Sequence, residues 1–162
     1  MEKQEFNMGK GVLFAFGAAV VAMAIWALII AMFDIGSGGA IGGVFAAAVG
    51  MLVASAYRFG QGKPDIAGIV IAALLAALAA GGAIIFGVAG YLANNDLVSG
   101  LFAGISGTFE LAGLSSEFAR ELYLSLAITT VVAAVIAAGT VKGVTAKKKD
   151  EEPPTPPQNP QA

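Results

Sequence analysis

Four long runs without a charged residue constrain the fold of this chain more than any other feature of its sequence. They cover residues 11–33, 38–57, 66–95 and 122–141. A helix of about 20 residues is long enough to cross the hydrocarbon core of a bilayer. Each run meets that length, so the sequence predicts an all-α, polytopic membrane protein with four transmembrane helices.

The composition agrees with several membrane crossings. Apolar residues make up 57% of the 162 residues and charged residues 12%, whereas a soluble domain carries about 45–50% and about 25%. A soluble protein of this length could not hide so much apolar surface in a single core. We therefore expect the surplus to face the lipid bilayer or another protein.

Several classes of chemistry are disfavoured by what the sequence lacks. It contains no Cys and no His, which removes disulfides, Cys/His metal sites and a histidine acid–base catalyst. Its ionisable residues lie at the ends of runs, in connections or in the tail, whereas ionisable groups inside spans usually mark proton relays and ion pathways. Its net charge of −2 gives no nucleic-acid footprint. We predict that the protein is not an enzyme and has no catalytic, cofactor-binding or metal site.

Small residues recur every four positions along the second run, GGAIGGVFAAAVGMLVASAY. The members of this stripe are Gly38, Gly42, Ala46, Gly50 and Ala54. In a helix they share one face, and a face without bulky side chains lets another membrane helix approach backbone to backbone. Shorter stripes occur in the other runs at Gly11, Ala15 and Ala19, at Gly68, Ala72, Ala76 and Ala80, and at Ala133 and Ala137. We predict helix-packing surfaces, which either close the bundle of one chain or leave one stripe to pair two chains.

The polar side chains inside the runs are mainly hydroxyls. Ser125 and Thr129 are four residues apart, so on a helix they share a face that could line a polar path. Serine and threonine in membrane helices also commonly bond the carbonyl oxygen four residues earlier, or a neighbouring helix. We favour packing for this pair and keep the polar path as the alternative.

The connection between the third and fourth runs carries a helical pattern of its own. Its apolar positions Leu97, Leu101, Ile105 and Phe109 are four residues apart, with Asn95 available as an N-cap. The segment is too polar and too rich in Gly and Ser for a fifth span. We predict an interfacial helix lying at the membrane surface or against the bundle, with a re-entrant segment as the alternative.

Aromatic residues and glycine suggest further local roles. Trp26 lies in the middle of the first run rather than in the interfacial belt where Trp is enriched, so it either fills space beside small residues or marks a site. Tyr57 and Arg58 are expected to anchor the second span at the membrane interface. Gly60 is expected to take the left-handed conformation that ends this helix.

A cleaved signal peptide competes with the first span. Lys3 and Lys10 precede the run, and Ala22-Met23-Ala24 fits a cleavage pattern. The apolar sequence nevertheless continues through IWALIIAMF, whereas the apolar part of a signal peptide is usually about 7–15 residues long. We therefore expect a retained span.

The predicted boundaries follow from these runs. They are 1–10 for the cytoplasmic N-terminus, 11–33, 38–58 and 66–93 for the first three spans, 94–116 for the connection, 117–142 for the fourth span with its outer extension, and 143–162 for a disordered, Pro-rich tail. Eight basic residues then share the side of the termini: Lys3, Lys10, Arg58, Lys63, Lys142, Lys147, Lys148 and Lys149. Only Arg120 falls on the other side. Because basic residues stay cytoplasmic, we predict a multi-pass protein of the cell inner membrane with both termini inside.

Four features of the middle of the chain occur together in other proteins. They are Trp26, the Gly-rich start of the second span at 38–43, Tyr57-Arg58, and the short basic connection at 60–63. Over roughly residues 11–140 the chain resembles a loose group of uncharacterised, small four-span bacterial integral membrane proteins. The resemblance implies a four-span fold in a bacterial plasma membrane, and it transfers no functional residue.

These observations predict a role that depends on packing rather than chemistry. We expect a non-catalytic accessory or self-assembling subunit whose partners are the lipid bilayer and a second copy or another membrane protein, with no nucleic acid. The alternative is a small channel or facilitator for an ion or small solute, with its path along Ser125 and Thr129.

Overall fold

The computed structural model describes residues 6–33, 39–95 and 99–150, with backbone alone for 39–40 and 144–150. This part of the chain forms five helices and no strand, which confirms the all-α prediction. The helices are α1 (Met8–Phe33), α2 (Gly39–Phe59), α3 (Ile66–Asn94), α4 (Leu101–Leu114) and α5 (Ser116–Asp150). Four stretches are long and apolar enough to cross a membrane: Met8–Phe33, Ile41–Phe59, Ile66–Asn94 and Ser116–Gly143.

Side-chain caps fix where several helices begin. The Asn7 Oδ1 atom accepts a hydrogen bond from the Lys10 amide at the start of α1 (3.1 Å), and Asp65 Oδ1 accepts one from the Gly68 amide at the start of α3 (2.9 Å). Ser115 Oγ accepts from the Phe118 amide in the first turn of α5. Each cap satisfies an amide that has no partner within its helix.

Asn95 plays a different part from the expected N-cap of the connecting helix. Its backbone amide and its Nδ2 atom both donate to the Tyr91 carbonyl oxygen, at 3.1 and 2.9 Å, so Asn95 closes α3. The N-cap position of α4 is Gly100, which has a φ of 100° and makes no side-chain capping bond. The expectation was wrong because helix α4 begins later than the apolar pattern suggested.

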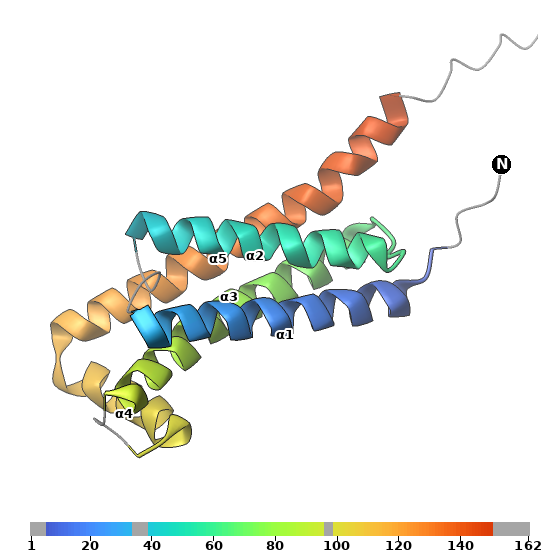
Figure 1. Cartoon of the computed structure of the whole chain (residues 1–162). Helices are drawn as coiled ribbons and strands as arrows, with labels where there is room; N and C mark the ends of the chain where they lie inside the picture. Colours follow the sequence, from blue (N-terminus) through green and yellow to red (C-terminus); the bar gives the residue numbers. More distant parts are fainter. Residues whose placement is uncertain (1–5, 34–38, 96–98, 151–162) are drawn as a thin grey trace, which may run out of the picture.

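The four long helices form one bundle (Figure 1). α1 packs against α2 and α3, α5 packs against the same two helices, and α2 also meets α3. Among the described residues, α1 and α5 make no close contact with each other. The start of α1 and the α2–α3 turn lie at one end of the bundle, and the end of α1 and helix α4 lie at the other end (Figure 1).

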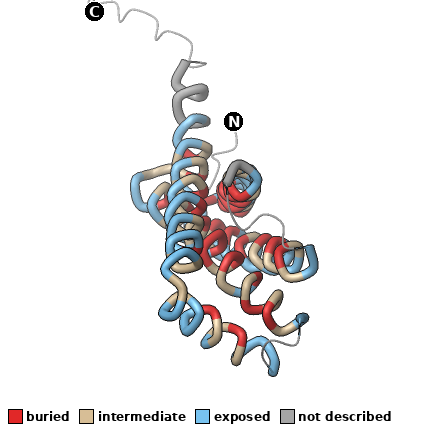
Figure 2. Tube along the Cα trace, turned by 90° about the vertical axis from the view of Figure 1, so that its left-hand side faces the viewer, coloured by how far each residue is buried: buried red, intermediate tan, exposed pale blue. Residues whose placement is uncertain are grey.

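Small residues fill the inside of the bundle and large apolar residues cover its outside. Most buried positions are alanine or glycine, and Trp26 and Tyr57 are the largest side chains that are fully buried. Figure 2 shows the buried positions where helices face one another and the exposed ones around them. Leu13, Val44 and Leu78 are each about 70% exposed, a surface suited to lipid rather than to water.

Helix α4 packs on α3 and α5 at the end of the bundle. Its contact face contains Gly104, which has no room for a β-carbon beside the backbone of Ala89, and Thr108, which is fully buried. Phe102 and Leu114 point away from the bundle and are more than 80% exposed. With 14 residues, α4 is shorter than a bilayer crossing; its interfacial position remains a prediction.

The last helix continues past the expected boundary at residue 142. It ends at Asp150 and projects beyond the bundle (Figure 1). Lysines 147–149 favour this extension because lysine is a good helix former and is stabilised near the negative end of the helix dipole. Residues 151–162, the rest of the predicted tail, lie outside the described residues.

Candidate functional site

The stripe of small residues on α2 faces the interior of the bundle. Its described members are all buried: Gly42, Ala46, Gly50 and Ala54. Gly38, the first predicted member, lies outside the described residues. A β-carbon on Gly50 would come within 2.5 Å of the Ala133 carbonyl oxygen and 3.2 Å of the Ala137 nitrogen. At this level α2 and α5 therefore meet backbone to backbone within a single chain.

The stripes of the other spans also face inward. Buried positions include Gly11, Ala15 and Ala19 on α1, Gly68, Ala72, Ala76 and Ala80 on α3, and Ala133 and Ala137 on α5. Between α1 and α3, a β-carbon on Gly87 would overlap the Ile30 side chain, and one on Gly90 would overlap Ala31. The small residues that the sequence singled out therefore close the bundle of one chain.

A second set of glycines faces outward and was missed at the sequence level. Gly17 on α1, and Gly139 and Gly143 on α5, are exposed, and a β-carbon at any of them would meet no atom within 4 Å. Gly139 and Gly143 are four residues apart and form a G-x-x-x-G pattern, which marks dimerising faces in membrane helices. The four-residue spacing is visible in the sequence, but the direction in which these two glycines face depends on how α5 packs.

The structure places Ser125 and Thr129 one turn apart on α5. Thr129 is 1% exposed, and its hydroxyl donates to the Ser125 carbonyl oxygen at 2.7 Å. The Thr130 hydroxyl likewise donates to the Leu126 carbonyl oxygen at 2.6 Å. In the described part of the chain, no buried side-chain nitrogen or oxygen lacks a hydrogen-bond partner. The hydroxyls of Thr129 and Thr130 are thus satisfied by their own helix and offer little to a passing solute.

Tyr57 is buried inside the protein and is not exposed to the membrane surface. Its side chain is 0% exposed, and its hydroxyl donates to the Lys63 carbonyl oxygen at 3.0 Å. Its ring fills the space beside Gly62 and Gly68, where a β-carbon on either glycine would overlap it. The expected anchoring role was wrong for Tyr57, because the chain turns back over the ring; Arg58 remains exposed.

The turn after Tyr57 is docked on the start of α1. The Asn7 amide donates to the Gln61 carbonyl oxygen at 2.9 Å, and a β-carbon on Gly60 would lie 2.6 Å from the Lys10 carbonyl oxygen. The left-handed residue here is Gln61, with a φ of 63°, and not Gly60 as expected. Gly60 is needed for the close approach of two chain segments rather than for its own conformation.

Charged groups separate to the two ends of the bundle. The exposed residues Lys10, Arg58 and Lys63 lie at the end that holds the α2–α3 turn, whereas Glu117, Arg120 and Glu121 lie in the first turns of α5 at the opposite end. The described residues contain no group of three or more acidic residues able to hold a metal ion. Comparison of the chain with known protein families, curated proteins and solved structures found no match.

Proposed function

We propose that this protein is a non-catalytic subunit of a membrane assembly in the bacterial plasma membrane, acting through helix packing. The observation that carries the proposal is the closed interior, in which Gly50 on α2 meets the backbone of α5 and Gly87 on α3 meets the Ile30 side chain of α1. The buried hydroxyl of Thr129 bonds within its own helix. Such an interior favours a packing role over a polar path for a solute.

The outward glycines supply the surface for assembly. Gly139 and Gly143 lie on α5 with open space beside them, and α5 is the span that makes no close contact with α1 in the described part of the chain. Val131 and Val135 continue the same side of the helix and are about 60% exposed. Small residues beside β-branched ones allow another membrane helix to approach closely, so α5 is the proposed contact with a second copy.

The charge asymmetry supports an orientation as well. Lys10, Arg58 and Lys63 lie at the end of the bundle where α1 begins, and basic residues are retained on the cytoplasmic side. We assign this end, and with it both termini, to the cytoplasm.

The deciding experiment is the mass of the purified protein in detergent, measured by light scattering and corrected for bound detergent. Self-assembly predicts a defined oligomer for the wild type and a smaller particle for Gly139→Leu. Gly17→Leu is the matched control, because it makes the same change at an outward, open glycine on another helix. A wild-type monomer, or an oligomer that survives Gly139→Leu, would contradict assembly through α5.

A flux assay separates this role from that of a channel. The wild-type protein, reconstituted alone in liposomes, is expected to leave the permeability to small ions and neutral solutes unchanged. A flux that rises with the amount of protein and disappears in Thr129→Val would overturn the proposal in favour of a path along α5.

A further inference from the structure

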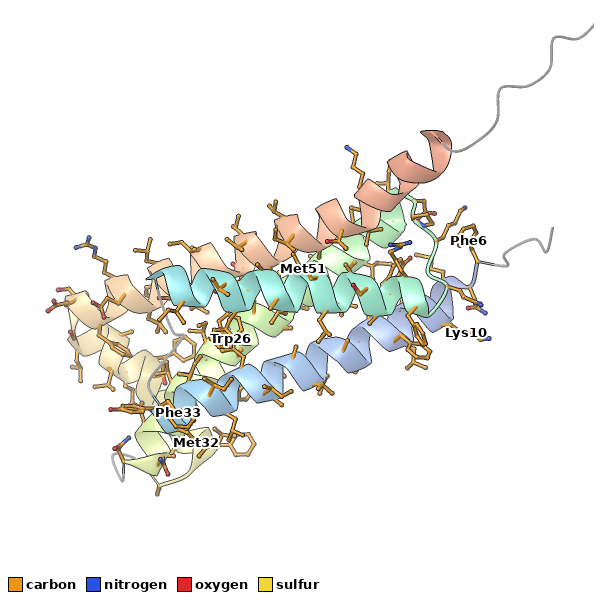
Figure 3. The ribbon with its side chains drawn as sticks, turned by 45° about the horizontal axis from the view of Figure 1, so that its top comes forward. Phe6, Lys10, Trp26, Met32, Phe33 and Met51 are labelled. Atoms are coloured by element: carbon orange, nitrogen blue, oxygen red, sulfur yellow. The ribbon has the colours of Figure 1, made fainter. Side chains whose placement is uncertain are left out.

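An apolar groove lies between α1 and α2 on the outer surface of the bundle. It has a volume of about 230 Å³ and is lined by Ala22, Ile25 and Trp26 from α1 and by Phe45, Ala48 and Leu52 from α2, among others. Figure 3 shows Trp26 in the space between these two helices. No charged side chain lines the groove.

The groove arises where small residues stand between large ones. The rings of Trp26 and Phe45 stack with their centroids 5.7 Å apart, and both residues line the groove. The lining also contains the small residues Ala22 and Ala48 and the larger residues Ile25 and Leu52, which are each about half exposed. The groove is thus built from the residues on the facing sides of two spans.

Its depth places the groove in the hydrocarbon layer. At 1.5 Å per residue, Trp26 lies about 10 Å from the Phe33 end of α1. Phe45 lies about 9 Å from the Gly39 end of α2 by the same measure. The hydrocarbon core is about 30 Å thick, so the groove opens toward acyl chains rather than toward headgroups.

We propose that this groove, which is lined in part by the stacked rings of Trp26 and Phe45, binds one acyl chain of a membrane lipid. Water does not fill an apolar recess, and an empty one forfeits the dispersion contacts of its lining. The groove is continuous with the lipid-facing surface through Ile25 and Leu52. The other possible occupant is a side chain from a second copy, and the dilution experiment below distinguishes it from lipid.

Trp26 itself reports on the occupant, because it is the only Trp in the chain. The full-length protein is reconstituted in vesicles of a phospholipid that carries bromine, a quencher of Trp fluorescence, near the middle of its acyl chains. The indole is among the residues that line the groove, so an acyl chain held in the groove would lie closer to it than a chain that merely passes over Ile25 and Leu52. Binding in the groove predicts that Trp26 loses most of its emission relative to vesicles of unbrominated lipid.

Two variants with the same substitution make the test specific. Ala48→Phe places a ring in the groove and is expected to restore most of the emission, whereas Ala24→Phe, at an exposed α1 position outside the groove lining, is expected to be quenched like the wild type. Equal quenching of the two variants would overturn the proposal. A second result would also overturn it. If the fluorescence of wild-type Trp26 were protected at high protein density and quenched only on dilution with lipid, a second copy of the protein would be covering the groove.

Discussion

The hydroxyl of Tyr57 donates a hydrogen bond to the backbone carbonyl oxygen of Lys63, 3.0 Å away, from a side chain that is 0% exposed. This contact joins the last turn of α2 to the segment that leads into α3. The ring also lies against Gly62 and Gly68, and the same turn receives the Asn7 amide from the start of α1. Tyr57 and the turn that follows it therefore join the ends of three spans at one end of the bundle.

Removing the Tyr57 hydroxyl tests this bond. Tyr57→Phe keeps the ring and leaves the Lys63 carbonyl oxygen without this donor, so we expect a loss of about 1–2 kcal/mol in the free energy of unfolding. Tyr57→Ala also empties the space of the ring and should cost roughly 3–5 kcal/mol. Equilibrium unfolding by SDS in mixed micelles measures both. Tyr123→Phe is the control, because Tyr123 is 56% exposed, and an equal loss there would contradict the assigned role.

The glycine contact between α2 and α5 gives a second prediction. In Gly50→Ala the new β-carbon would lie 2.5 Å from the Ala133 carbonyl oxygen. The two helices must then move apart, with an expected cost of roughly 1–3 kcal/mol, typical of overpacking. The same unfolding measurement applies.

Gly17→Ala is the matched control for Gly50→Ala. Gly17 is exposed, with nothing within 4 Å of a β-carbon, and alanine is the better helix former by about 1 kcal/mol. We expect this variant to be unchanged or slightly more stable. A Gly50→Ala protein as stable as Gly17→Ala would show that α2 and α5 do not meet at this point.

The cap of α3 gives a third prediction. Asp65 Oδ1 accepts a hydrogen bond from the Gly68 amide at 2.9 Å, so Asp65→Ala should lower the free energy of unfolding by about 1 kcal/mol. Asp65→Asn keeps a capping oxygen and should recover most of the loss. The ion pair between Lys63 and Asp65, at 3.6 Å, is largely exposed and adds little. If Asp65→Asn lowered the free energy of unfolding as much as Asp65→Ala, the charge of Asp65 rather than its capping oxygen would stabilise the start of α3.

Several structural features could be predicted because they depend on short stretches of sequence. The four apolar runs set the number of spans, because crossing a bilayer requires a minimum length of apolar helix. The Ser115 cap of α5 is a local feature of the same kind, since capping involves only the next turn. The stripe at Gly42, Ala46 and Gly50 was readable from its four-residue period, which the helix converts into a single face.

Other features were decided by contacts between segments far apart in the chain. The stripe on α2 could have met any helix, because small residues fit any close partner; the fold places Gly50 against Ala133 on α5. Tyr57 looked like an interfacial residue until the turn through Gly62 covered it. The groove at Trp26 exists only because α2 brings Phe45 beside it. Hydropathy and helical period are local properties and determined the spans, whereas the direction in which each face points depends on non-local packing and belongs to the tertiary structure.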